Sequence, residues 1–127
     1  MTESTRLSTQ GRPVVLLAED EPVVRNFVQM ALTRAGYDVL AASDGIEALQ
    51  LSRAYDGVIH LLLSDMQMPK MIGSELARTI VQERPDIRVL LMTGKSSNEI
   101  PQQLRPDLLR KPFLPRVLLG QIERVLS

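Results

Sequence analysis

The stretch from His60 to Pro69, HLLLSDMQMP, constrains the fold more than any other part of the chain. Its apolar run ends abruptly at Ser64 and Asp65, and a loop closed by Pro69 follows. This pattern is typical of a buried strand with a carboxylate at its C-terminal tip. Open α/β sheets bind their ligands at that end of the strands. The stretch therefore predicts an α/β fold with an acidic site at one edge of its sheet.

Polar side chains also stand at or near the ends of three other apolar runs. Glu19 and Asp20 follow the run Val14–Ala18, Thr93 ends another, and Lys111 lies near the end of a further one. If these runs are neighbouring parallel strands, one edge of the sheet carries three acids, a hydroxyl and an ammonium group. Such a set suits phosphoryl transfer to an aspartate.

Extended and helical patterns alternate from Pro13 onwards, without internal repeats. The expected strands lie at about 13–18, 37–42, 58–64, 87–92 and 107–110. The expected helices run from Pro22 to Ala35, from Asp44 to about Asp56, from beyond Pro69 to near Glu83, and from Pro115 onwards. Residues 95–106 contain two prolines, so any helix there should be short or mobile. Short connections between these units imply a doubly wound parallel sheet with helices on both faces.

The helical segments have recognisable ends and apolar faces. Pro22 and Pro115 suit a first turn, and Gly36 is placed as a left-handed stop. Asp44 and Glu47 have the spacing of a capping box. The expected apolar faces consist of Val24, Phe27 or Val28, Ala31 and Ala35; Ile46, Ala48, Leu49 and Leu51; Ile72, Leu76, Ala77, Ile80 and Val81; and Leu118, Ile122 and Val125.

Length and charge limit the class of protein. The 127 residues, 44% of them hydrophobic, suffice for one core, so we expect a disordered leader over 1–11 and one domain over 12–127. Lys plus Arg balance Asp plus Glu at 15 each, which argues against direct nucleic-acid or membrane binding. No apolar segment reaches membrane-spanning length, so the chain is expected to be soluble. The lack of cysteine is compatible with a reducing cytosol, and we expect a cytoplasmic protein.

Four motifs resemble those of a known family. They are AEDEP (18–22), LLLSDMQMPKMIG (61–73), LLMTG (90–94) and RKPF (110–113). Together they resemble the CheY-like receiver domain of two-component response regulators over most of the chain. The resemblance implies a flavodoxin-like, five-stranded parallel sheet in the order 2-1-3-4-5. It also implies a module that takes a phosphoryl group from a histidine kinase or phosphotransfer protein and signals by a conformational change.

The same resemblance assigns roles to the acids. Asp65 would be the phosphoacceptor. Glu19 and Asp20 would hold Mg²⁺ together with Asp65 and the backbone carbonyl of Gln67. Three crowded carboxylates repel one another, and a hard divalent cation relieves that repulsion. The alternative interpretation is that these are solvated loop acids, with Asp20 or Asp65 serving as a helix cap.

Two further residues complete the implied site. The Thr93 hydroxyl would bind a phosphoryl oxygen, and Lys111 would pair with the phosphoryl group. By pattern alone Thr93 could simply end a strand and Lys111 could lie on the surface. The family commonly has a cis peptide at the position of Lys111–Pro112. His60 and the methionines near Asp65 are expected to have structural roles.

The sequence also departs from the family pattern. Family members usually carry an aromatic or His residue three positions before the conserved Lys, where this chain has Leu108. We therefore expect coupling by aromatic rotation to be weakened or replaced. The stretch between Thr93 and Lys111 is also shorter than usual, so the partner surface that it forms in the family is expected to be remodelled or absent.

Two alternatives from other functional classes remain open. A pseudo-receiver would keep the fold as an interaction module without phosphorylation. A haloacid-dehalogenase-type phosphatase would need a second Asp two residues after the first, where this chain has Gln67. In the leading interpretation, the protein does not act as an enzyme on external substrates. It catalyses only the phosphorylation and dephosphorylation of its own Asp. We expect either a stand-alone receiver or part of a hybrid histidine kinase, with a homodimer possible.

Overall fold

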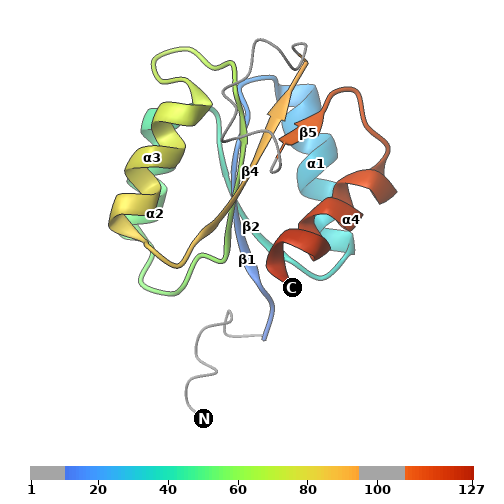
Figure 1. Cartoon of the computed structure of the whole chain (residues 1–127), viewed down its shortest axis with the longest axis horizontal. Helices are drawn as coiled ribbons and strands as arrows, with labels where there is room; N and C mark the ends of the chain where they lie inside the picture. The colour runs from blue at the N-terminus through green and yellow to red at the C-terminus, as the bar shows by residue number, and fades with distance from the viewer. Residues whose placement is uncertain (1–10, 95–107) are drawn as a thin grey trace.

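The computed structural model describes residues 11–94 and 108–127 (Figure 1). The predicted leader, except for Gly11, and the predicted short or mobile helix within 95–106 lie outside the described residues. No helix in the described ranges combines the length and the apolar character that crossing a bilayer requires.

Five parallel strands form one sheet in the order β2-β1-β3-β4-β5. This order confirms the predicted 2-1-3-4-5 arrangement. The strands are β1 (Val14–Ala18), β2 (Asp38–Ala42), β3 (Leu61–Asp65), β4 (Arg88–Thr93) and β5 (Leu108–Arg110). The described helices are α1 (Pro22–Arg34), α2 (Gly45–Ala54), α3 (Gly73–Glu83) and α4 (Pro115–Leu126). Because all strands run in one direction, their C-terminal ends share one edge of the sheet.

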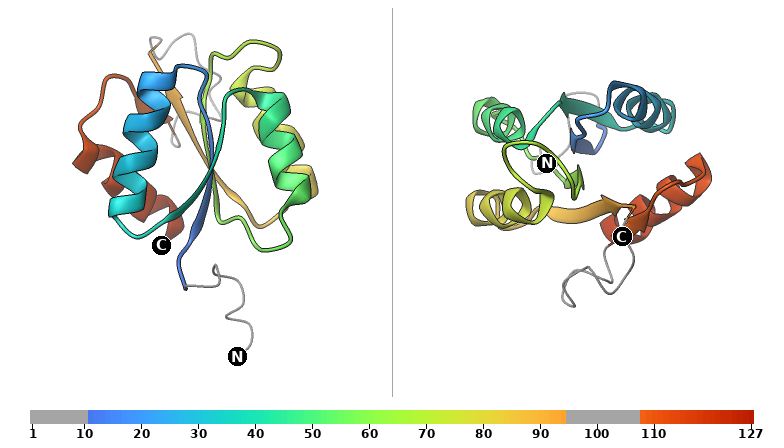
Figure 2. Two further views of the ribbon diagram at one scale, coloured as in Figure 1. Left: turned by 180° about the vertical axis from the view of Figure 1, so that it is seen from behind. Right: turned by 90° about the horizontal axis from the view of Figure 1, so that it is seen from above.

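Helices cover both faces of the sheet. α2 and α3 lie on one face, and α1 and α4 lie on the other (Figure 2). Alternate strand residues divide between two buried clusters, with Leu16 and Leu62 facing α2 and α3, and Leu17 and Leu63 facing α1 and α4. Strands buried on both faces read as continuous apolar runs, which explains the pattern seen in the sequence. By the same alternation, Asp65, the last residue of β3, lies on the same face of the sheet as Leu61 and Leu63.

α1 ends as its sequence predicts, within one residue. Gly36 has a φ of 98°, a conformation that favours glycine. Its N–H donates to the carbonyl of Thr33 over 3.2 Å, and the Tyr37 N–H donates to that of Leu32 over 3.0 Å. These two bonds form a Schellman motif. The motif reverses the chain so that β2 can pair with β1.

The capping box predicted for α2 is present in a shifted form. The Asp44 carboxylate accepts the Glu47 N–H over 2.8 Å, as an N-cap should. The Glu47 carboxylate reaches back to the N–H of Ser43 over 2.7 Å rather than to that of Asp44. Asp44 also pairs with Lys70 at 3.3 Å, which connects α2 to the loop between β3 and α3.

Several side chains predicted for apolar helix faces are exposed instead. Ile46 is 40% exposed and Val81 is 39% exposed, because they flank the strip of each helix that contacts the sheet. Ile72 is 50% exposed because it is the N-cap of α3 rather than part of its first turn. Of the two alternatives in α1, Val28 is the buried residue, whereas Phe27 is 41% exposed. Ala35, also expected on that face, is the exposed C-cap of α1.

The start of β3 also differs from the prediction. The strand begins at Leu61 instead of Val58, since Leu61 is the first residue that pairs with β1, opposite Val15. Pairing with a neighbour, which the apolar pattern does not report, decides where a strand starts.

Candidate functional site

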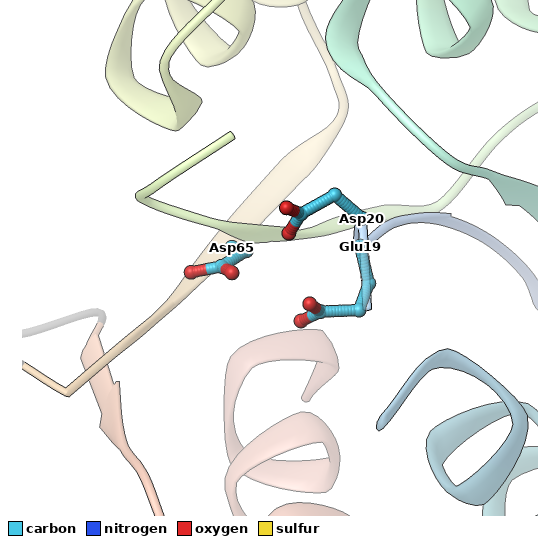
Figure 3. Close-up of side chains that lie close together, drawn as sticks. All are labelled: Glu19, Asp20 and Asp65. Carbon is cyan, nitrogen blue, oxygen red and sulfur yellow. The ribbon is translucent and has the colours of Figure 1, made fainter. Parts of the chain in front are cut away.

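Three acids meet at the C-terminal edge of the sheet. Glu19 and Asp20 directly follow β1, and Asp65 is the last residue of β3. Each offers a carboxylate oxygen that lies within 4.8 Å of those of the other two. Figure 3 shows the three carboxylates turned toward one common space. We call Glu19, Asp20 and Asp65 the acidic cluster.

Glu19 is the most buried member of the acidic cluster, with no exposed surface. One carboxylate oxygen lies 3.1 Å from the Lys111 ammonium, and the other accepts the Glu21 N–H over 3.1 Å. Burial raises the pKa of Glu19, and the negative charge of Asp65 adds to the rise. The bonds from Glu21 and Lys111 oppose it. The protein therefore holds a carboxylate where its ionised form is disfavoured.

Lys111 connects two members of the acidic cluster. Its Nζ atom lies 3.1 Å from Glu19 Oε1 and 3.1 Å from Asp65 Oδ2. Burial alone would lower the pKa of Lys111, but the hydrogen bonds and charges of Asp65 and Glu19 outweigh burial and raise it. The ammonium form is thus stabilised next to Asp65. The Lys111–Pro112 peptide bond is cis, as the resemblance implies.

Local backbone contacts hold Asp65 in place. Its Oδ1 atom accepts the Gln67 N–H over 3.2 Å. The start of α3 packs directly on this backbone, where the Gly73 N–H donates to the Met66 carbonyl over 3.0 Å. A Cβ added at Gly73 would lie 2.9 Å from the Met66 Cα and closer still to the Asp65 carbonyl oxygen. Gly73 closes the LLLSDMQMPKMIG motif, yet its contact with Asp65 is not evident from the sequence.

Thr93 lies at the same edge of the sheet. It is fully buried and ends β4, one residue beyond the partner of Asp65 in that strand, Met92. Its carbonyl accepts the Lys111 N–H over 2.7 Å, which fixes the start of the segment after β5. Gln67 follows Asp65 in the loop after β3 and is exposed. The structure therefore brings the predicted residues of all four segments to one edge.

One residue at the site was not predicted from the sequence. Arg25, in the first turns of α1, donates from Nη1 to the Glu19 carbonyl over 2.8 Å and to the Asp20 carbonyl over 3.5 Å. The feature of the sequence that could have identified Arg25 is its position, about one helical turn after Glu19 and Asp20. It supports the backbone of the loop whose side chains enter the acidic cluster.

The opposite edge of the sheet contains a separate feature. A cavity of about 500 Å³ is lined there by residues that include His60, Arg84 and Leu126. His60 Nδ1 accepts the Val14 N–H over 3.0 Å, which ties the residue before β3 to the start of β1, far from the acidic cluster. Met66 and Met68 are buried in the core. These contacts agree with the structural roles expected for His60 and the methionines.

The donor chemistry of the acidic cluster fits a hard divalent cation. Three carboxylates stand together, and Lys111 is the cation seen bonded to their side chains among the described residues. Carboxylate oxygens at this spacing are the ligands that Mg²⁺ and Ca²⁺ prefer. The arrangement combines a positioned carboxylate, a cation-binding set and an ammonium group at one point.

Comparison with known proteins finds relatives that point to one family. The family model described as "Response regulator receiver domain" matches residues 15–123. The response regulator receiver protein CpdR of Brucella abortus is 37% identical over 120 residues, which are 88% of this chain and 95% of that protein. The aerobic respiration control protein ArcA of Escherichia coli is 35% identical over 91% of this chain but only 49% of its own length. The sensor kinase CckA of Brucella abortus is 33% identical over 92% of this chain and 13% of its own.

A solved structure shows the same fold. The chemotaxis protein CheY4 of Vibrio cholerae aligns with a TM-score of 0.82 and 31% identity, over 91% of this chain and 99% of that one. The family model, the relatives and the shared fold agree with one another. The chain therefore belongs to the response regulator receiver domain family, whose members are phosphoacceptor modules of two-component signal transduction.

Proposed function

We propose that Asp65 is the residue that accepts the phosphoryl group. The observation that carries the proposal is the Lys111 ammonium 3.1 Å from Asp65, within the acidic cluster at the ligand-binding edge of the sheet. A carboxylate oxygen of Asp65 attacks the phosphorus of a phosphohistidine. The bond from phosphorus to the imidazole nitrogen breaks, and its electron pair remains on that nitrogen. The product is an acyl phosphate on Asp65.

The surrounding residues have separate tasks in this proposal. Lys111 pairs with the new phosphoryl oxygens, and the Thr93 hydroxyl donates a hydrogen bond to one of them. The carboxylates of Glu19, Asp20 and Asp65, with the Gln67 carbonyl, would hold Mg²⁺. When bound, the cation neutralises charge on the phosphoryl oxygens. The domain would in this way promote its own phosphorylation and dephosphorylation without acting on other substrates.

The proposed phosphodonor is a histidine kinase or a histidine phosphotransfer protein. An exposed apolar strip on α1 supports a protein donor: Val23 is 81% exposed, Phe27 41% and Met30 53%. Leu114, just before α4, is 55% exposed, and the rings of Phe27 and Phe113 lie 6.4 Å apart. In the sequence, Val23 follows closely after Asp20, and Phe113 and Leu114 follow closely after Lys111, so a donor bound to this surface would lie near the acidic cluster. We propose that the domain acts in the cytoplasm, and a chain without cysteine is compatible with that reducing compartment.

The test is incubation with acetyl phosphate and Mg²⁺, followed by intact-mass measurement. The wild-type domain is expected to gain the mass of one phosphoryl group, and Asp65→Asn is expected to gain none. Asp56→Asn, at an exposed position far from the acidic cluster, is the matched control and should be labelled like the wild type. Absence of labelling in the wild type, or equal labelling of Asp65→Asn, would refute the proposal.

A further inference from the structure

Glu19 and Asp20 lie in the loop between β1 and α1, which we call the acidic loop. Arg25 contacts the main chain of this loop rather than its carboxylates. Its Nη1 atom lies 2.8 Å from the Glu19 carbonyl oxygen and 3.5 Å from the Asp20 carbonyl oxygen. We propose that Arg25 is a positioning residue, which sets the affinity of the acidic cluster for a divalent cation by fixing the backbone behind two of its ligands. The inference rests on the cation site proposed above.

The loop between β1 and α1 is held at two ends. On the sheet side, the Glu19 N–H donates to the Ala42 carbonyl of β2 over 3.0 Å. On the helix side, Arg25 belongs to α1 through its own N–H, which donates to the Glu21 carbonyl over 2.8 Å. The guanidinium then reaches back to the loop. Arg25 therefore couples the rigid start of α1 to the peptide groups that carry both acids.

This restraint matters because the acids repel one another. Glu19, Asp20 and Asp65 offer oxygens within 4.8 Å of each other, so without a cation the loop lowers its energy by turning a carboxylate away. Glu19 is held by Lys111 and by the Glu21 N–H. For the Asp20 carbonyl, Arg25 is the side-chain donor among the described residues, at 3.5 Å. The Glu21 N–H of the same peptide group donates to Glu19. A ligand set held in place before binding loses less entropy when the cation arrives.

Positioning and simple electrostatics predict opposite results. Arg25 is a positive charge near the acidic cluster, so its Coulomb effect alone opposes cation binding. Replacing it with a neutral side chain would then strengthen binding. If Arg25 acts by positioning, the same replacement weakens binding in spite of the lost repulsion. The sign of the change in Kd separates the two effects.

The experiment measures the Kd for Mg²⁺ by calorimetric or NMR titration of the folded domain, without any phosphodonor. Arg25→Met is expected to bind roughly tenfold more weakly, as is usual when an outer-shell support of a metal ligand is removed. Arg25→Lys keeps the charge but loses the planar fork, and should give an intermediate Kd. Arg34→Met, on the exposed last turn of α1, is the matched control and should bind like the wild type. Unfolding of each variant is measured without divalent ions.

Each outcome decides the inference. Weaker binding by Arg25→Met, with partial recovery in Arg25→Lys, supports it. An unchanged or tighter Kd overturns it, even if the variant unfolds at a lower temperature, because the role of Arg25 is then only structural or electrostatic. If Arg25→Met does not fold, Arg25→Lys decides by the same comparison with the wild type. If the wild type itself does not bind Mg²⁺, the proposed cation site fails as well, which distinguishes the two failures.

Discussion

At the scale of single residues, Gly73 shows how closely the site is packed. The first residue of α3 lies against the peptide group that joins Asp65 to Met66, with no space for a side chain. This contact lets α3 begin directly behind the last residue of β3. The position of the Asp65 carboxylate therefore depends on the lack of a Cβ atom at Gly73, the first residue of α3.

We expect Gly73→Ala to lower stability and to slow the proposed phosphorylation of Asp65. The added methyl group must push apart two backbone segments, and overpacking of this kind typically destabilises by about 1–3 kcal/mol. Chemical denaturation and the rate of labelling by acetyl phosphate measure the two effects.

The matched control is Gly120→Ala. Gly120 lies within α4 with no atom within 4 Å of an added Cβ, so this substitution should stabilise the helix by up to about 1 kcal/mol. Equal stability of Gly73→Ala and the wild type would mean that the contact at Gly73 relaxes without cost.

At the scale of elements, the N-terminus of α2 is joined to the loop after β3. Asp44 caps α2 through the Glu47 N–H and pairs with Lys70 in that loop. Next to it, a Cβ on Gly45 would lie 2.8 Å from the Cβ of Met71. The loop that follows Asp65 thus packs against the start of a helix that belongs to a different strand connection.

Asp44→Ala is expected to destabilise the protein by about 1 kcal/mol at neutral pH, the usual effect of losing an N-cap. Asp44→Asn keeps a capping oxygen and should lose less. The hydrogen bond from the Glu47 N–H, with help from Lys70, lowers the pKa of Asp44 below its ordinary value of 3.8. Its stabilising effect is therefore complete above that value and is lost as the pH falls through the lowered pKa.

Urea denaturation of wild type and Asp44→Ala over a pH series measures this effect. The difference in unfolding free energy should shrink on acidification below pH 3.8, the ordinary value for Asp44. A difference that stays constant through the acid range would show that the charge of Asp44 contributes nothing.

At the scale of the whole molecule, the site exists only in the folded chain. Lys111 bonds to Glu19, 92 residues away in the sequence, and to Asp65, 46 residues away. An unfolded chain does not gather these groups, so a cation that binds the acidic cluster stabilises the native state alone.

Addition of Mg²⁺ should therefore raise the free energy of unfolding. The gain should reach about 2.7 kcal/mol when Mg²⁺ is at about 100 times its Kd, and a chelator should reverse it. Thermal or urea unfolding with and without Mg²⁺ measures the gain. Asp20→Asn is the comparison, because it removes one carboxylate and should lose most of the effect. The same stabilisation in that variant would place Mg²⁺ elsewhere.

The part of the fold that the sequence predicted follows from local patterns. Apolar runs located the strands, Gly36 and Asp44 marked helix ends, and the strand tips located Glu19, Asp20 and Asp65. The effect of Leu108 on signalling stays a prediction, although the structure shows its place at the start of β5, packed against the core cluster that contains Leu91.

The tertiary structure alone decided how these residues meet. It showed that Glu19 is fully buried between Lys111 and the Glu21 N–H, that Arg25 holds the acidic loop, and that Gly73 presses on Asp65. The physical reason is the separation in sequence between the residues that interact. Helix and strand periodicity is encoded within a few neighbouring residues, whereas burial, ion pairing and close backbone approach depend on strand register and helix packing between segments far apart in the chain.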